Sequence, residues 1–316
     1  MQIKKIKKPD NKTKYSKIAS EEGNIFNTLE WLNILGNNLK LFGIYENDGR
    51  LIGGFSLFKN KKFGLNIYIN PPFTPYVGPF FQKPNNIDKE RKIILLLANY
   101  IDNLPSAIVS FSLNKGINDV IPFIWKKFKT TPQYTYIINL DNPEKIFARI
   151  FKNRRNDISK AVKDGLIVKK TSDFSMVKRL ILKTFLRQKK KINRLFLDKI
   201  LFNFASDNNA FAFIAFKNKK PIATTFCIYD KNTAYYLLGG YDYKNKHHGA
   251  GALCLWESIK YAQKIGLEYF DFEGSIVPQI EKYFRGFGGK LISCFRISKA
   301  KLPLEIILKL FKRELF

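Results

Sequence analysis

The residues best suited to chemistry lie between positions 235 and 274, in the run YYLLGGYDYKNKHHGAGALCLWESIKYAQKIGLEYFDFEG. Apolar residues up to Leu238 predict a strand, a loop rich in glycine and basic residues follows, and Gly249, Ala250 and Gly251 open a helix. Glycines let a backbone approach a ligand closely, and the N–H groups and dipole at a helix start attract anions. This order of strand, loop and helix predicts a pocket for a phosphate or a carboxylate.

Three polar residues precede these glycines, namely Lys246, His247 and His248. The two histidines are the only ones in the chain, and they are neighbours rather than i and i+4 partners on a helix. A metal site would need a third ligand, and none is suitably spaced, so we predict no metal site. We expect these residues to contact a phosphate or to form a polar loop, and we assign neither histidine as a base.

Two carboxylates follow in the stretch YFDFEG, where Asp271 and Glu273 alternate with Phe270 and Phe272. On a strand this alternation places both carboxylates on one face. A carboxylate whose pKa is raised by surrounding aromatic side chains could accept a proton from an amine nucleophile. Glu273, and after it Asp271, are therefore the candidate catalytic residues, although a carboxylate that binds a loop amide gives the same pattern.

Backbone groups and cations complete the candidate site. The amides of Gly239 and Gly240, at the end of the strand before the loop, could polarise the carbonyl of a donor. Guanidinium groups bind phosphate oxygens in a forked geometry, so we expect three arginines to bind substrate. They are Arg154, Arg155 and Arg285. The first two fit a solvated helix face equally well.

The proline-rich loop NPPFTPYVGPFF contains Tyr76, which could line a cleft for an acceptor. A packed turn is an equally good interpretation of this loop.

What the sequence lacks argues against several enzyme classes. No Gly-x-Ser-x-Gly elbow presents a nucleophile, and no dinucleotide fingerprint follows an N-terminal strand. The stretch FRGFGGKL departs from a nucleotide-binding loop, because Phe284 replaces the first glycine and Leu291 the residue that holds magnesium. Cys227, Cys254 and Cys294 lie in apolar runs without Cys-x-x-Cys spacing, which argues against disulfides and zinc.

The composition describes a packed protein with a strong positive charge. Its 316 residues are 45% hydrophobic and carry a formal net charge of +29, which favours anionic partners. A genome biased toward lysine codons is an equally weighted explanation of this charge. No run of eighteen apolar residues could cross a bilayer, and we expect the protein in the cytoplasm.

The elements that must position these residues fall into two similar series. Residues 39–58 and 210–229 each predict a β-hairpin, with turns at 46–50 and 217–220, and a further strand begins at 233. Each hairpin has a helix before it and a helix and strand after it. The helices are 28–35, 93–101, 174–186 and 253–265, and the strands 107–113 and 269–272. A duplicated α/β unit explains this order, and chance similarity of two hairpins remains open.

A basic helix marks the join between the two series. The strand YTYIINL ends before Pro143, which begins a predicted helix that Gly165 ends. We therefore predict domains at residues 1–141 and 142–300, followed by a basic amphipathic helix at 301–316. That helix could lie on an anionic membrane or pack on its own domain, and the second alternative is slightly favoured.

Lys246 and the glycines at 249 and 251 resemble the Gln/Arg-x-x-Gly-x-Gly/Ala signature of the GNAT acyltransferases, with lysine in the first position. The stretches DFEGSIVPQIEKYFRGFGGKL, ARIFKNRRNDISKA and NPPFTPYVGPFF resemble FemAB-like proteins, a tandem-GNAT branch. This resemblance implies an α/β (α+β) fold of two tandem GNAT-like domains, with mixed, mostly antiparallel sheets flanked by helices. It also implies an acyl-donor groove in the second domain.

The resemblance implies transfer of an acyl group to an amine of a cell-envelope or nucleotide-linked precursor. Acyl-CoA is the favoured donor because the glycine loop is retained, and in GNAT enzymes that loop holds the pyrophosphate of coenzyme A. The alternative is an aminoacyl-tRNA-dependent transferase of the FemAB kind, which the positive charge supports. A third alternative is a binding protein that kept a GNAT fold without its chemistry.

Overall fold

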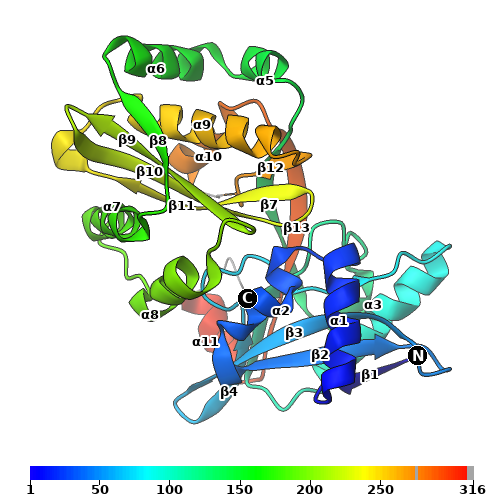
Figure 1. Ribbon diagram of the computed structural model, residues 1–316. Coiled ribbons are helices and arrows are strands. Elements are labelled where there is room, and N and C mark those ends of the chain that lie inside the picture. Colours follow the sequence, from blue (N-terminus) through cyan, green and yellow to red (C-terminus); the bar gives the residue numbers. More distant parts are fainter. Residues whose placement is uncertain (275–276, 312–316) are drawn as a thin grey trace. The chain divides into compact units, whose positions relative to one another are not determined.

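The computed structural model describes residues 1–274 and 277–311. The chain forms two compact units, each an α/β structure with its own run of paired strands (Figure 1). Unit 1 comprises Met1–Gln133 and Ser293–Phe316, and unit 2 comprises Tyr134–Ile292. No helix of the described residues is long and apolar enough to cross a membrane.

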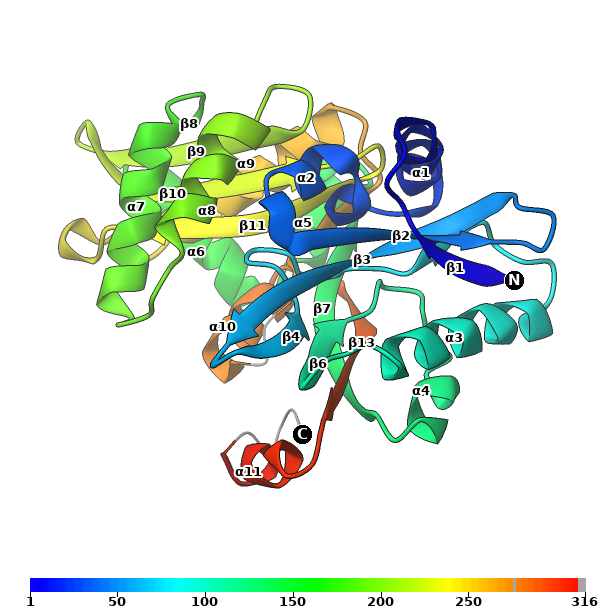
Figure 2. The same ribbon diagram turned by 90° about the horizontal axis from the view of Figure 1, so that it is seen from below.

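The sheet of unit 1 has the strand order β1-β2-β3-β4-β6-β13, with β5 paired to β3. Its strands are β1 (Gln2–Lys5), β2 (Leu39–Tyr45), β3 (Leu51–Lys62), β4 (Leu65–Ile69), β5 (Phe80–Phe81), β6 (Ile108–Ser112) and β13 (Lys290–Ala300). The helices are α1 (Pro9–Glu22), α2 (Leu29–Asn33), α3 (Ile87–Asp102), α4 (Ile121–Trp125) and α11 (Leu304–Phe311), and η1 (Ile25–Asn27) and η2 (Gly36–Asn38) are short 3₁₀ turns. Helices α1 and α3 cover opposite faces of this sheet (Figures 1 and 2).

The sheet of unit 2 has the strand order β7-β12-β11-β10-β9-β8. Its strands are β7 (Lys129–Asn139), β8 (Ile167–Thr171), β9 (Ala210–Lys217), β10 (Lys220–Tyr229), β11 (Thr233–Tyr241) and β12 (Tyr269–Asp271). The helices are α5 (Pro143–Arg149), α6 (Lys152–Lys163), α7 (Phe174–Arg187), α8 (Arg194–Asp198), the π-helix η3 (Lys199–Phe204), the 3₁₀ turn η4 (Tyr243–Asn245), α9 (Ala250–Lys264) and α10 (Pro278–Arg285). Helix α7 covers one face, α9 covers the other, and α6 packs on α9.

The two sheets have the same topology, which explains the two similar series in the sequence. In unit 1 the antiparallel strands β2, β3 and β4 are followed by α3 and by β6, which pairs parallel to β4. In unit 2 the antiparallel strands β9, β10 and β11 are followed by α9 and by β12, which pairs parallel to β11. The predicted hairpins and the mixed, mostly antiparallel sheets are thus confirmed.

The sixth strand of each sheet comes from a distant part of the sequence. Strand β7, which follows α4, pairs with β12 of unit 2, and residues 296–300 of β13, which follows α10, pair with β6 of unit 1. The compact units therefore divide at 133 and 293, whereas the prediction divided the chain at 141 and 300. A sequence pattern shows that a strand exists but not which sheet it joins.

The predicted single helix after Pro143 is wrong, because the structure has two helices, α5 and α6. Ile150 and Phe151 between them are extended, and the Phe151 amide donates a hydrogen bond to the carbonyl of Gly286. Gly165 follows the end of α6, as predicted, with a φ of +73°.

Of the predicted helix 301–316, α11 covers 304–311, and residues 312–316 lie outside the described residues.

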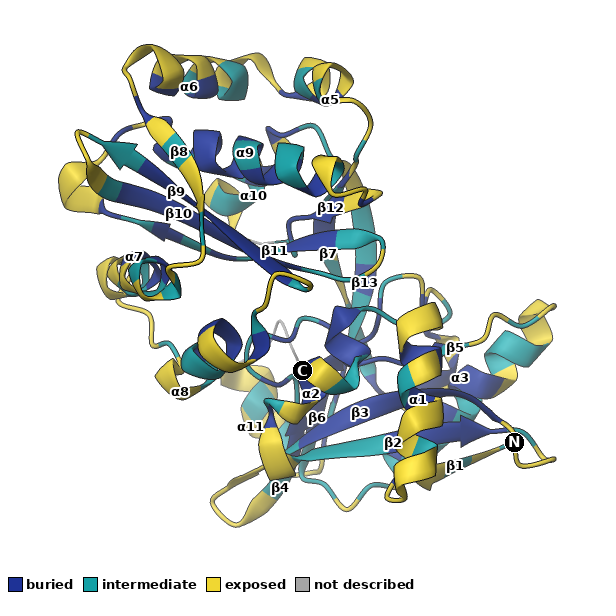
Figure 3. Ribbon diagram, viewed as in Figure 1, coloured by how far each residue is buried: buried dark blue, intermediate teal, exposed yellow. Residues whose placement is uncertain are grey.

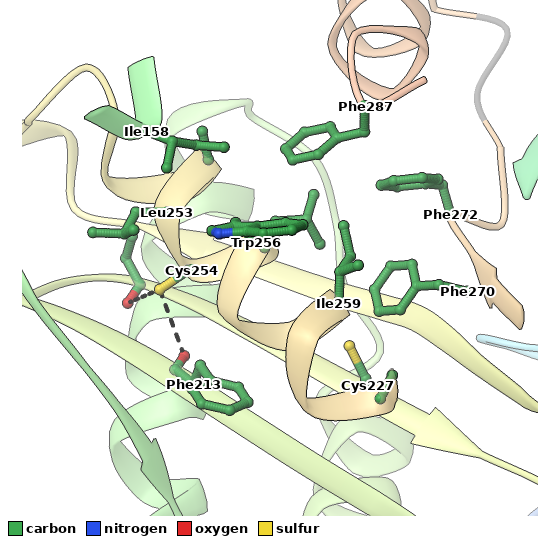
Figure 4. Packing of buried hydrophobic residues seen from close by; sticks show 14 of the residues in the cluster. Ile158, Phe213, Cys227, Leu253, Cys254, Trp256, Ile259, Phe270, Phe272 and Phe287 are labelled. Carbon is green, nitrogen blue, oxygen red and sulfur yellow. Dashed lines mark hydrogen bonds between the residues drawn. The ribbon is translucent and has the colours of Figure 1, made fainter. Parts of the chain in front are cut away.

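The core of unit 2 forms where α9 and α10 meet the sheet. Helix α9 is largely buried, whereas the outer side of α6 is exposed (Figure 3). The rings of Phe270, Phe272 and Phe287 gather near Trp256 in Figure 4. The cysteines Cys227, Cys254 and Cys294 are buried thiols, and burial raises the pKa of the first two. Thiols in such surroundings are inert.

Substitutions in β13 test its contribution to the core of unit 1. Ile297 is fully buried there, whereas Leu291 on the same strand is half exposed. We expect Ile297→Ala to lower the free energy of unfolding by about 2–4 kcal/mol and Leu291→Ala by less than about 0.5 kcal/mol. Urea unfolding measures both. Equal losses would contradict the placement of Ile297 in this core.

Candidate active site

Strands β11 and β12 separate where the candidate site begins. They pair in parallel only over residues 233–235 and 269–271, and β11 then continues to Tyr241 while β12 ends. Aromatic rings pack next to the separating strands. The ring centroids of Tyr236 and Phe284 are 5.8 Å apart, and those of Phe272 and Phe284 are stacked at 5.1 Å. A ligand that enters between these strands would contact aromatic side chains on α10 and β11.

A buried carboxylate ends β12. Asp271 accepts hydrogen bonds from the Thr135 hydroxyl, at 2.5 Å, and from the Glu273 amide, at 2.8 Å. Glu273 has a φ of +56°, and a Cβ at Gly274 would lie 1.9 Å from the carbonyl oxygen of Tyr134. The predicted strand alternation therefore stops at Asp271, and the two carboxylates do not share a strand face.

The positions of the two carboxylates indicate different roles. Asp271 is fully buried and holds the turn, which is the structural alternative for this residue. Glu273 is half-buried, in a left-handed conformation that is uncommon for residues other than glycine. Its carboxylate is near enough to Cys227 to add to the effect of burial in raising the pKa of that thiol. Catalysis by Glu273 stays a prediction.

The loop before α9 is held by Asp242. Its carboxylate accepts hydrogen bonds from the Lys183 ammonium group, at 2.7 Å, and from the Lys244 amide and the Asn245 side chain, both at 3.1 Å. The hydrogen bond from Lys183 is the main cause that lowers the pKa of Asp242 to about 2. The loop conformation thus depends on a charged group from α7.

The two histidines bind acidic residues of α6 and its C-terminal end. The Nδ1 of His247 accepts a hydrogen bond from the Gly249 amide at 3.2 Å, so its proton is on Nε2, which lies 2.9 Å from Asp164. This hydrogen bond lowers the pKa of Asp164. His248 is mostly exposed and pairs with Asp157 at 2.6 Å. The amide of Gly249 is therefore already used within the protein.

Two of the predicted ligand-binding glycines are required by packing. A Cβ at Gly249 would lie 2.0 Å from the carbonyl oxygen of Asp157 on α6. A Cβ at Gly240 would lie 2.6 Å from the amide nitrogen of Ile181 on α7. At both positions a helix backbone comes as close as the absence of a side chain allows.

Gly251 has different surroundings. The nearest atom to a Cβ there would be the hydroxyl oxygen of Tyr283, at 3.4 Å, which is an ordinary contact. The amides of Gly251 and Ala252 have no hydrogen-bond acceptor among the described residues. These two amides, rather than that of Gly249, are the groups at the start of α9 that remain for an anion.

Two tyrosine hydroxyls next to the glycines were not predicted as site residues. The hydroxyl of Tyr236 lies directly over Gly239, 1.9 Å from where a Cβ would be, and that of Tyr283 faces Gly251. Burial raises the pKa of both phenols, so both are protonated hydrogen-bond donors at neutral pH. No spacing in the sequence indicates the first of them, because residues i and i+3 of a regular strand point to opposite faces, and a register shift between β10 and β11 brings Tyr236 over Gly239.

Comparisons with known proteins identify the segment that contains this loop. Residues 180–285, which contain β11, the glycine loop and α9, match the model of the acetyltransferase (GNAT) domain. Residues 180–285 thus form a GNAT domain. No curated protein sequence matches it.

Solved structures show the fold of the whole chain. The structure of FemX superimposes with a TM-score of 0.69 at 12% identity, covering 98% of this chain and 99% of that chain. The structure of L-PGS from Bacillus licheniformis gives a TM-score of 0.58 at 12% identity, with 98% and 97% covered. A conserved protein of unknown function from Bacteroides thetaiotaomicron gives 0.60 at 15% identity, with 95% and 99% covered. The chain thus has the predicted tandem GNAT-like fold.

The three predicted arginines differ in burial and in their partners. Arg154 is mostly buried, 4.2 Å above the ring of Tyr283, and pairs with Asp157. Arg285 pairs with Glu281 at 3.0 Å. Arg155 is partly exposed and forms no side-chain ion pair within the described part of the chain. Arg154 thus binds within the protein, and phosphate binding by Arg155 and Arg285 stays a prediction.

The side chain of Lys246 lies on an exposed aromatic ring. Its ammonium group is 4.9 Å from the centroid of Tyr243, and the guanidinium group of Arg187 is 5.3 Å from the same centroid. The loop of the GNAT domain therefore presents a half-exposed ring next to two cations, which suits an anionic ligand with aromatic groups.

Tyr76 lies in unit 1, within a packed turn. Its ring is buried, 6.1 Å from that of Phe26, and the ammonium group of Lys115 is 5.3 Å from its centroid. Nearby, Asn114 accepts a hydrogen bond from the Gly78 amide. This is the packed-turn alternative for the loop, and a role of Tyr76 in acceptor binding stays a prediction.

The two glycines of the loop should respond differently to an added methyl group. We expect Gly249→Ala to lower the free energy of unfolding by about 2 kcal/mol or more, because the methyl group meets the carbonyl of Asp157. Gly251→Ala should change it by less than about 0.5 kcal/mol. Chemical denaturation measures both. A stable Gly249→Ala variant would contradict the close contact of α6 and α9.

The pair of Lys183 and Asp242 predicts how stability depends on pH. Because the folded state lowers the pKa of Asp242, this pair stabilises the fold above about pH 4, and the contribution is lost as pH falls toward about 2. We expect Lys183→Met to raise the pKa of Asp242 and to move the midpoint of acid unfolding to higher pH. Acid titration followed by circular dichroism tests this, with the exposed Lys163→Met as control. Identical midpoints would contradict the assignment.

Proposed function

We propose that this protein is an N-acyltransferase that binds an activated acyl donor in unit 2 and transfers the acyl group to an amine. The main support is the separation of β11 from β12 directly before a glycine loop that opens α9, inside the segment that matches a GNAT domain. Such an arrangement offers backbone amides to both the carbonyl and the phosphate of a donor.

Acyl-CoA is the favoured donor. Its pyrophosphate would bind the amides of Gly251 and Ala252 at the positive end of the α9 dipole. The edge of β11 beyond Tyr235 does not pair with β12, so amides near Gly239 would polarise the acyl carbonyl. The buried hydroxyl of Tyr236, which lies over Gly239, is a further donor for that oxygen.

The reaction requires only direct attack by the amine. The amine nitrogen forms a bond to the carbonyl carbon, the thioester carbon–sulfur bond breaks, and coenzyme A leaves as the thiol after taking a proton. Glu273, or a water that it orients, accepts the proton lost by the amine. An amine of a cell-envelope or nucleotide-linked precursor is the proposed acceptor, on the basis of the resemblance to FemAB-like proteins.

An aminoacyl-tRNA is the second candidate donor. Its support is the ring of Tyr243 beside Arg187 and Lys246, together with the net charge of +29. Cations and an exposed ring suit phosphates and bases of RNA. A GNAT fold that only binds its ligand is the third candidate, and it requires that no acyl transfer occurs with either donor.

The variant Gly251→Val tests the donor site. We expect it to weaken binding of coenzyme A at least tenfold, or about 1.4 kcal/mol, because the larger side chain crowds the start of α9. Isothermal titration measures the affinity, and the melting temperature should change little. A variant that melts much earlier but binds normally per folded molecule would refute this donor site. Salt-dependent binding of charged and uncharged tRNA distinguishes the second donor.

The variant Glu273→Gln tests the proposed base. We expect kcat with a labelled acyl donor to fall about 100-fold, with an unchanged melting temperature. Glu268→Gln is the matched control, because Glu268 is exposed and lies just before β12. If both variants keep full activity, Glu273 is not the base.

A further inference from the structure

Helix α11 carries an apolar stripe that faces away from the rest of the described chain. Ile306, Ile307, Leu310 and Phe311 follow one another at helical spacing and are all at least half exposed. Leu310 is 76% exposed and Phe311 82%. Single exposed apolar residues are common on protein surfaces, whereas four on one eight-residue helix form a patch that is typical of an interaction site.

Helix α4 presents a second exposed apolar group in unit 1. Ile121, Ile124 and Trp125 are all exposed, and Trp125 is 58% exposed. The other two tryptophans of the chain, Trp31 and Trp256, are buried. An indole ring with one polar edge suits the boundary between water and lipid.

One cavity lies between the segment after α4 and the start of α11. It has a volume of about 440 Å³, and its lining includes Lys127 and Phe128, directly after α4, and Leu302 and Glu305, at the start of α11. The amide of Lys301 donates a hydrogen bond to the carbonyl of Ala107, which anchors the start of α11 to unit 1. The segment after α4 and the start of α11 therefore border one cavity of unit 1.

The charge of this region is positive. Its acidic side chains are paired with lysines, Glu305 with Lys309 at 2.6 Å and Asp102 with Lys299. Lys127 and Lys301 are exposed and form no ion pair within the described residues. Apolar groups and unpaired lysines next to each other suit a surface that is both apolar and anionic.

We propose that α4, α11 and the cavity between the segment after α4 and the start of α11 form a docking surface for an anionic phospholipid bilayer. The apolar side chains of α11 and the ring of Trp125 enter the boundary of the acyl chains, and the lysines contact the headgroups. A second copy of this chain is a poor occupant, because lysines are depleted in protein interfaces and two chains of charge +29 repel each other.

This surface lies outside the proposed acyltransferase site and does not depend on it. Binding to vesicles is measured without turnover, so failure of one proposal leaves the other unaffected.

Sedimentation with vesicles tests the proposal. We expect the full chain to bind vesicles of equimolar phosphatidylglycerol and phosphatidylcholine, and to bind phosphatidylcholine alone much more weakly. The double variant Leu310→Ser with Phe311→Ser should lower the partition coefficient about tenfold or more. Leu186→Ser is the matched control, because Leu186 is 81% exposed on α7 beside Arg187 but lies in unit 2.

Fluorescence locates the contact. Because Trp125 is the exposed tryptophan, bromine-labelled lipids should quench it, and its emission should shift to shorter wavelength in anionic vesicles. Trp125→Phe should remove both signals. Unchanged melting temperatures of all variants would show that the fold is kept.

Three results would overturn the proposal. The first is no binding to anionic vesicles. The second is equal binding by the α11 double variant and by Leu186→Ser, which would indicate attraction of a polycation without a specific surface. The third is dimerisation in sedimentation velocity that the double variant abolishes while vesicles are not bound, which would make a second copy the occupant.

Discussion

The candidate site depends on the two hydrogen bonds that Asp271 accepts from Thr135 and from the Glu273 amide. A carboxylate buried without donors would be very costly, so these bonds fix the direction of the chain after β12. They end the strand, hold Glu273 in a left-handed conformation and separate the chain from β11. This separation leaves the edge of β11 beyond Tyr235 unpaired with β12, next to the aromatic side chains of α10.

Local pattern was sufficient to predict most elements of the fold. The hairpins at 39–58 and 210–229 could be predicted because alternating strands and short polar turns are local features. The break between α5 and α6 could not, because the bond from Phe151 to Gly286 joins residues that are far apart in sequence. The resemblance to FemAB-like proteins contributed the tandem arrangement, which periodicity alone left open.

The sequence indicated which residues to consider for the site, but not the contacts that these residues make. Gly240, Gly249 and Gly251 look alike in sequence, yet the first two allow helix backbones to approach and only the third borders unoccupied space. Arg154 was predicted to bind phosphate, but it stacks on Tyr283 and pairs with Asp157. A residue type indicates what chemistry is available, whereas the partners that use it are set by packing between distant segments.

The exchange of sixth strands has a consequence for synthesis on the ribosome. The sheet of unit 1 is completed by residues 296–300, which are made only after all of unit 2. Until then the edge of β6 has no partner on that side, and an unpaired strand edge is a site for intermolecular pairing. The sheet of unit 1 therefore stays incomplete until the last part of the chain is made. A chaperone that covers strand edges would act during this interval.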